Sequence, residues 1–173
     1  LAAPMYASAA KHAAEIATAI AKRSRELEQA GYHAQVTAFE NSFPLFLHDE
    51  NGARRALSRN EEGKYQPKTS NATAEYSADE LADWALREPQ RFSPNVTLRA
   101  VIQDFLLPTI AYYGGAAEIA YFAQTSEVYR LLDRPVTPIL HRASITLVER
   151  HTWRTLERYG VTRLALFGST ARN

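Results

Sequence analysis

The sequence lacks cysteine entirely among its 173 residues. That absence excludes a disulfide framework and any metal site built from thiolates. No apolar run approaches the roughly 20 residues that a membrane-spanning helix needs. The 20 basic residues balance 19 acidic ones, and no block of like charge stands out. We therefore expect a cytoplasmic protein whose partners include neither nucleic acid nor membrane.

Several short catalytic motifs are also missing. The chain has no H-E-x-x-H, no G-x-S-x-G and no G-x-G-x-x-G, so the zinc-protease, serine-hydrolase and dinucleotide fingerprints are all absent. The five histidines show no spacing typical of metal ligands. We predict no metal site.

Hydrophobic periodicity predicts helices alternating with strands over much of the chain. Asn51-Gly52 predicts a hairpin turn, because both positions of the favoured turn take positive φ. From position 96 onward the alternation favours an α/β layer with parallel strands. Expected helices cover 5–30, 78–88, 96–105, 115–124, 126–132 and 149–159, and expected strands cover 35–39, 107–113, 136–141, 144–148 and 161–167, with a turn at 91–95. The predicted segments are an N-terminal helix (1–34), an antiparallel β extension (35–76), an α/β half-domain (77–159) and an atypical tail (160–173).

The joint between the predicted strand 107–113 and the following helix is the first candidate site. Gly114 and Gly115 stand at this joint, and Glu118 lies one turn into the helix. Ligands of open α/β sheets bind beyond the carboxyl ends of the strands, and glycines let a ligand approach backbone N–H groups. A tight turn, with Glu118 favouring the helix dipole, explains the same residues. The joint alone leaves both interpretations open.

A second candidate lies in SPNVTLRAVIQD (93–104). Asn95, Arg99 and Gln103 recur every four residues, so a helix would place them on one face. Two amides and a guanidinium suit a polyhydroxylated or carboxylate ligand. Alternatively, Asn95 caps the helix and Arg99 pairs with Asp104 or another surface neighbour.

These two stretches carry a resemblance that extends over residues 92–150. The order F-S-P-N-V-x-x-R-x-x-x-Q, then L-P-x-x-A-Y-x-x-G-x-x-E-I-x-Y, closely resembles the bacillithiol biosynthesis cysteine-adding enzyme family, BshC. The resemblance implies a Rossmann-like fold related to class I aminoacyl-tRNA synthetases, with a helical coiled coil and a possible homodimer at full length. It implies addition of cysteine to glucosaminyl-malate in an ATP-driven amide bond formation, with ATP expected for the full-length family and no cofactor for this chain.

The family pattern also implies which positions bind substrate. Arg99 would hold a malate carboxylate, and Glu118 would bind an amine or sugar hydroxyls. The full set of implied substrate-binding positions is Asn95, Arg99, Gln103, Gly114, Gly115, Glu118, Tyr121 and Arg142.

Three departures from the family pattern stand out. Ala100 replaces a usual proline, and Ala116-Ala117 replaces a usual Pro-Gly. Without that glycine the loop loses a position that tolerates positive φ, which should force Gly114-Gly115 to absorb the turn and shift the pocket. The histidine-containing motif of an N-terminal nucleotide-binding half has no counterpart here, so we expect a partial chain without ligase activity of its own.

The C-terminal stretch YGVTRLALFGSTARN (159–173) resembles a different family. Its G-S-x-A-R is similar to the opening motif of minimal nucleotidyltransferases, which also need a later D-x-D. Two other functions therefore stay open, a non-catalytic binding module and the N-terminal part of a fused nucleotidyltransferase.

Overall fold

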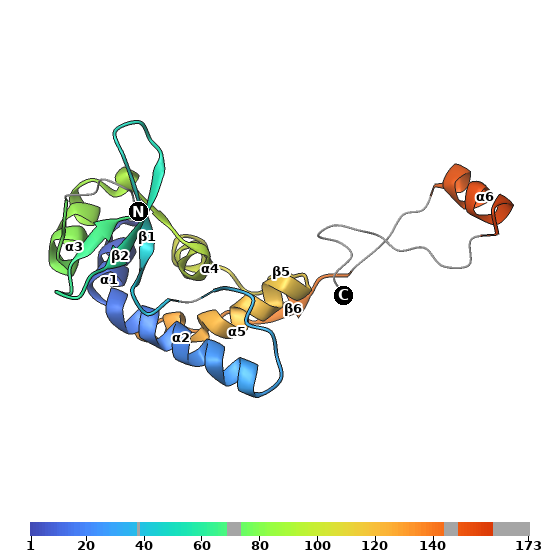
Figure 1. Cartoon of the computed structure of the whole chain (residues 1–173), viewed down its shortest axis with the longest axis horizontal. Helices are drawn as coiled ribbons and strands as arrows, with labels where there is room; N and C mark the ends of the chain where they lie inside the picture. The colour runs from blue at the N-terminus through green and yellow to red at the C-terminus, as the bar shows by residue number, and fades with distance from the viewer. Residues whose placement is uncertain (38, 69–73, 144–148, 161–173) are drawn as a thin grey trace.

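The computed structural model describes residues 1–37, 39–68, 74–143 and 149–160. Its strands form a four-stranded antiparallel sheet, ordered β3-β2-β1-β4, and a two-stranded parallel sheet of β5 and β6 (Figure 1). This confirms the predicted α/β class, with parallel strands and a separate antiparallel extension.

The N-terminal region contains two helices where the sequence predicts one. Helix α1 (Ala3–Lys11) and helix α2 (Ala13–Gln29) meet at His12, whose backbone has φ −93° and ψ 16°. The two helices bury their faces against different partners, since α1 packs mainly on α3 and α2 on β1 and α5. One straight amphipathic helix could not pack its apolar face against both sets of partners.

The antiparallel sheet is built around β1 (Ser42–His48), with β2 (Arg54–Arg59) and β3 (Tyr65–Pro67) on one side. The Asn51-Gly52 hairpin is confirmed, and Gly52 has a φ of +76° that disfavours a residue with a side chain. The predicted strand at 35–39 is wrong, because no strand occurs among its described residues.

The predicted turn at 91–95 is also wrong in part. Residues Phe92–Pro94 form β4, which pairs antiparallel with the other edge of β1, opposite Leu45 to Leu47. A three-residue strand leaves almost no periodic signal in the sequence, and only its distant partner β1 makes it a strand.

Helix α3 (Ala78–Arg87) begins with the predicted capping box. The Ser77 backbone N–H donates to Glu80 Oε2 at 2.7 Å, and the Glu80 N–H donates to Ser77 Oγ at 3.2 Å. The helix ends before the short 3₁₀ helix η1 (Pro89–Arg91), as expected from the proline.

The second half of the chain contains α4 (Val96–Leu106), β5 (Tyr112–Gly114), α5 (Ala116–Leu131), β6 (Ile139–His141) and α6 (Arg150–Arg158). The prediction of a buried strand over 107–113 is wrong, because only its last two residues join β5 and Ile110 is 89% exposed. The two short helices predicted after Gly115 form one helix, α5. The predicted strands at 144–148 and 161–167 lie outside the described residues.

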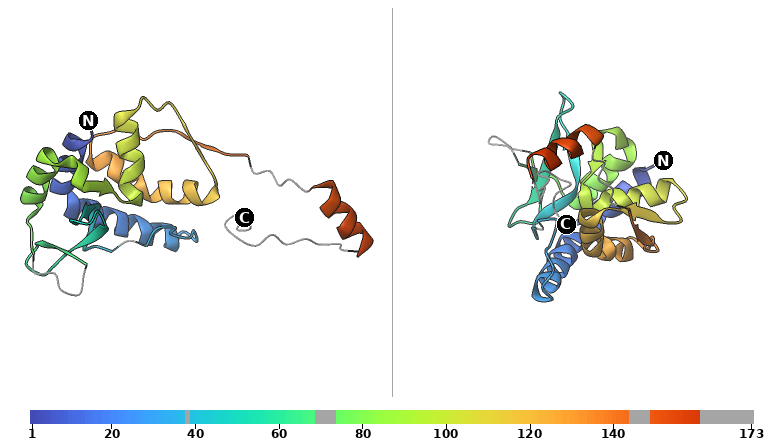
Figure 2. Two further views of the ribbon diagram at one scale, coloured as in Figure 1. Left: turned by 90° about the horizontal axis from the view of Figure 1, so that it is seen from above. Right: turned by 90° about the vertical axis from the view of Figure 1, so that its right-hand side faces the viewer.

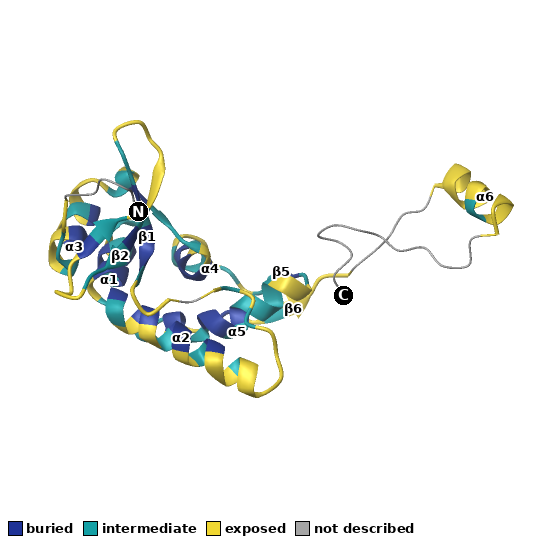
Figure 3. Cartoon of the chain, in the orientation of Figure 1, coloured by how far each residue is buried: buried dark blue, intermediate teal, exposed yellow. Residues whose placement is uncertain are grey.

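Helix α5 joins the two halves of the structure. It packs against both α2 and α4 (Figure 2), and the buried residues gather where these elements face one another (Figure 3). At its centre Gln124 is fully buried. Its Oε1 accepts from the Val36 N–H at 2.9 Å, and its Nε2 donates to the Val36 carbonyl at 2.9 Å and to Ser24 Oγ at 2.8 Å.

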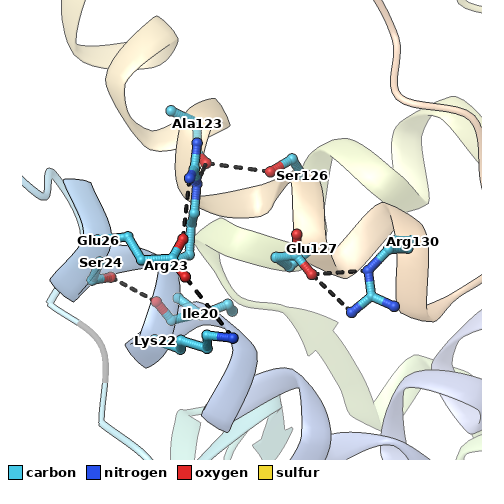
Figure 4. Close-up of polar contacts among 9 residues, drawn as sticks. All are labelled: Ile20, Lys22, Arg23, Ser24, Glu26, Ala123, Ser126, Glu127 and Arg130. Atoms are coloured by element: carbon cyan, nitrogen blue, oxygen red, sulfur yellow. Dashed lines mark hydrogen bonds and ion pairs between the residues drawn. The ribbon is translucent and has the colours of Figure 1, made fainter. Parts of the chain in front are cut away.

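A second polar contact between α2 and α5 lies nearer the surface. Arg23 Nε donates to the carbonyl of Ala123 at 3.2 Å, while its Nη1 reaches Glu26 on its own helix (Figure 4). The Ser24 hydroxyl that accepts from Gln124 donates in turn to the Ile20 carbonyl at 2.8 Å. Polar groups at this interface are therefore paired rather than buried alone.

We predict that Gln124→Ala lowers the free energy of unfolding by about 2–4 kcal/mol, because it leaves the Val36 amide and carbonyl unpaired and opens a cavity. Urea denaturation monitored by circular dichroism measures the change. The matched control is Gln29→Ala at the exposed end of α2, expected within about 0.5 kcal/mol of wild type. Equal midpoints for the two variants would contradict the role of Gln124.

Candidate functional site

The candidate site lies where β5 and β6 end. The two strands are parallel, Gly114 is opposite His141, and the Arg142 N–H donates to the Gly114 carbonyl at 2.8 Å. Helix α5 begins directly after Gly115. Gly114, Gly115 and Arg142 therefore share one rim, at the carboxyl edge where α/β proteins bind ligands.

The glycines allow close packing, and neither has the positive φ expected from the sequence. Gly115 has φ −75°, and Gly114 is absent from the residues with positive φ. Ala116 and Ala117 lie in the first turn of α5 rather than in a loop. The expectation that Gly114-Gly115 must absorb a turn in their place is therefore wrong. A Cβ on Gly114 would stand 3.2 Å from Glu118 Cβ, so a side chain here would push against the helix.

Glu118 folds back over the start of its own helix. Its Oε2 accepts from the Gly115 N–H at 2.6 Å and lies 3.7 Å from an Arg142 Nη2 that is largely exposed. This is the carboxylate half of a capping box, so the structural interpretation of Glu118 holds. Its other oxygen, Oε1, has no hydrogen-bond partner among the described residues and can accept from a ligand.

Tyr121 brings the two candidate stretches together. Burial, followed by the neighbouring Tyr112 and Glu118, raises the pKa of Tyr121 to about 12, and Arg99 acts in the opposite direction. The charges of Arg99 on α4 and of Glu118 on α5 thus both contribute to the electrostatics at this phenol. At neutral pH this phenol stays protonated and can donate a hydrogen bond.

The other two members of the α4 row behave differently from Arg99. Asn95 caps α4, and its Oδ1 accepts from the Thr97 and Leu98 N–H groups at 3.1 and 3.0 Å. The side-chain oxygen of Asn95 is therefore already occupied by the helix cap. Gln103 is half-buried one turn beyond Arg99. Whether either binds substrate stays a prediction.

Sequence reasoning missed the role of Asp104, which it considered only as a surface partner of Arg99. No ion pair joins Asp104 and Arg99 among the described residues. Instead Asp104 Oδ2 accepts from the Tyr129 hydroxyl at 2.5 Å and from the Thr137 hydroxyl, linking α4, α5 and the segment before β6. Burial and this carboxylate raise the pKa of Tyr129. The three residues are far apart in sequence, so no local signal identifies the cluster.

The described residues contain neither a cluster of metal ligands nor a membrane-spanning helix. No group of three or more acidic or histidine side chains is arranged to hold a metal ion. None of the described helices has the length and apolar character to cross a membrane. The nucleotidyltransferase-like stretch 161–173 lies outside the described residues.

We predict that Glu118→Ala costs about 1 kcal/mol of unfolding free energy, because the Gly115 N–H loses its acceptor. Glu127→Ala on the same helix is the matched control. The Glu127 side chain pairs with the exposed Arg130 and with no other charged group in the described residues, so its loss should cost less than about 0.5 kcal/mol. A Glu118 variant as stable as the Glu127 variant would show that the cap contributes nothing.

We also predict a loss of stability in alkali. The raised pKa of Tyr121 means that the folded state keeps a proton that the unfolded phenol releases near pH 10. This contribution is fully present below pH 10 and is lost as pH rises towards 12. Urea midpoints at pH 9, 10 and 11 should fall less steeply for Tyr121→Phe than for wild type. Tyr32→Phe, at an exposed position, should leave the slope unchanged. Identical slopes for Tyr121→Phe and Tyr32→Phe would contradict the raised pKa of Tyr121.

Residues 1–143 match a family model described as "Bacillithiol biosynthesis BshC, N-terminal Rossmann-like domain". The match confirms the Rossmann-like fold class. It also places the described α/β half within the family's N-terminal domain. The expectation that the chain lacks the family's nucleotide-binding half stays a prediction.

Curated relatives agree with this match. The chain is 45% identical over 159 residues to a protein of Koribacter versatilis, 40% over 161 residues to one of Solibacter usitatus, and 36% over 160 residues to one of Heliobacterium modesticaldum. All three are named as candidate cysteine ligases, BshC. Each alignment covers 92–93% of this chain but only 28–29% of the relative. The chain thus spans under a third of the length of these relatives, and it belongs to the BshC family of bacillithiol biosynthesis.

Proposed function

We propose that this chain supplies part of the substrate site of a ligase that adds cysteine to glucosaminyl-malate, the last step of bacillithiol synthesis. The proposal depends chiefly on one observation, the placement of the Glu118 carboxylate at the Gly114-Gly115 rim, where its Oε2 accepts from the Gly115 N–H at 2.6 Å and lies 3.7 Å from Arg142 Nη2. A cation, a carboxylate and a neutral hydroxyl then face a substrate that carries carboxylates, hydroxyls and an amine.

Each side chain has a distinct task in this proposal. Arg99 is exposed and forms no ion pair among the described residues, so its guanidinium is available to a malate carboxylate. The free Oε1 of Glu118 accepts from the amine or a sugar hydroxyl. Tyr121 donates from its protonated phenol, and Arg142 at the rim adds positive charge. These residues bind and orient the substrate; the bond-forming groups are not assigned.

The phosphates of ATP do not fit this rim. The first N–H of the joint, that of Gly115, already donates to Glu118 at 2.6 Å. The same carboxylate would repel phosphate oxygens at the start of α5, where a helix otherwise attracts anions. ATP, which the family resemblance implies for the longer protein, would have to bind elsewhere, and no step of the proposal uses it here.

A non-catalytic binding module is the second candidate. The observation that favours it is the use of Asn95 and Glu118 as helix caps, which gives both residues a structural reason to be present. Under this alternative the rim holds the fold together and has no ligand.

Isothermal titration of residues 1–173 with glucosaminyl-malate tests the proposal. We expect saturable heat without ligase activity, and at least tenfold weaker binding for Arg99→Gln, since a hydrogen-bonded charge contributes about 1.5–3 kcal/mol. Arg130→Gln on the outer part of α5 is the matched control and should bind like wild type. If millimolar glucosaminyl-malate gave no heat, the non-catalytic module that does not bind this substrate would be favoured. If residues 1–173 alone formed product, the expectation that this chain has no ligase activity of its own would be refuted.

A further inference from the structure

A hollow lies in the antiparallel part of the molecule, away from the rim. It is an open depression of about 440 Å³ between the β1–β2 hairpin, the end of β3, α3 and η1. None of its described lining residues comes from β5, α5 or β6. The volume lies within the range of small-molecule pockets, and the proposed ligase site does not account for it.

Apolar and aromatic side chains form one wall of this hollow. Leu47 and Pro67 line it beside the rings of Tyr76 and Trp84, whose centroids are 5.7 Å apart. Trp84 also packs edge-on against the buried Phe92, which fixes its ring. This wall can cover a compact apolar body.

Arg91 provides a cation that is held in place without a carboxylate. Its guanidinium carbon lies 4.7 Å from the centre of the Trp84 ring, and its Nη2 donates to the His48 carbonyl at 3.2 Å. No acidic group lies within ion-pair distance of Arg91 in the described part of the chain. A guanidinium has five N–H donors, so most of them remain for a ligand.

The second arginine of the hollow, Arg55, is already neutralised. Its Nε and Nη2 lie 2.8 and 2.7 Å from Asp49 Oδ2, while Asp49 Oδ1 accepts from the N–H groups of Asn51 and Ala53. Glu50 also borders the hollow, but it is exposed at the hairpin end, where water and salt screen its charge. Arg91 therefore remains as the half-buried charge without a counter-ion.

We propose that this hollow binds a small carboxylate with an apolar or aromatic body. The carboxylate pairs with Arg91, whose stacking on Trp84 orients the guanidinium beforehand, as bidentate recognition requires. The body lies against Leu47, Pro67 and Tyr76. Arg91 also links η1 to the end of β1, so occupancy would stabilise the edge of the antiparallel sheet.

Trp84 provides a direct optical test. The other tryptophan, Trp153, lies exposed on α6, so Trp153→Phe leaves Trp84 as the reporter. We expect 3-phenylpropionate to change its fluorescence saturably, with a dissociation constant on the order of 1 mM for a ligand of this size. The neutral 3-phenylpropionamide should bind at least tenfold more weakly. No saturable change up to 20-fold that concentration, or equal binding of acid and amide, would overturn the proposal.

Variants of Arg91 in the same Trp153→Phe background identify the cation. Arg91→Gln should weaken binding of 3-phenylpropionate at least tenfold, and Arg91→Lys should weaken it less, since it keeps the charge but loses the planar fork. Arg87→Gln on the exposed face of α3 is the control and should bind as the parent does. If Arg91→Gln proves unfolded by circular dichroism, the Lys variant decides. Binding unchanged in a folded Arg91 variant would show that the carboxylate binds elsewhere.

Discussion

The buried amide of Gln124 is the interaction on which the arrangement of the two halves depends. It pairs with both main-chain groups of Val36 and with Ser24, so α5 is joined to α2 and to the connecting segment at once. An unpaired amide at zero exposure would be costly. Because Gln124 and its two partners come from three separate stretches, the amide selects one placement of α5 against α2 and the segment that follows α2.

That placement determines what the rim can do. With α5 fixed at its centre, its first two turns carry Glu118 and Tyr121, and the charge of Arg99 on α4 acts on the same phenol. The Asp104 cluster with Tyr129 and Thr137 fixes α4, the later part of α5 and the approach to β6 in a similar way. The candidate binding groups are therefore carried on rigid helices whose positions are set by buried polar contacts, which suits a site that must orient a polar substrate.

Glu118 shows how one residue can serve two interpretations. Its Oε2 caps the helix, which explains its position without any ligand, and its Oε1 stays available. The short approach between Gly114 and Glu118 Cβ explains the glycine in the same structural way. The choice between a tight turn and a ligand site at this joint is thus no longer exclusive, since the cap holds the carboxylate where a ligand could meet it.

Local chemistry alone determined the Asn51-Gly52 hairpin, the Ser77–Glu80 capping box, the α4 helix and the α/β class, because each depends on residues close together in the sequence. The two motifs that contain Gln103 and Glu118, at 92–103 and 107–121, were also enough to indicate the family. Tertiary structure alone decided that Phe92–Pro94 is a strand, that the 107–113 stretch is largely exposed, and that Asp104 is paired with Tyr129 rather than Arg99. These depend on partners distant in the chain, whose contacts no periodicity or spacing records.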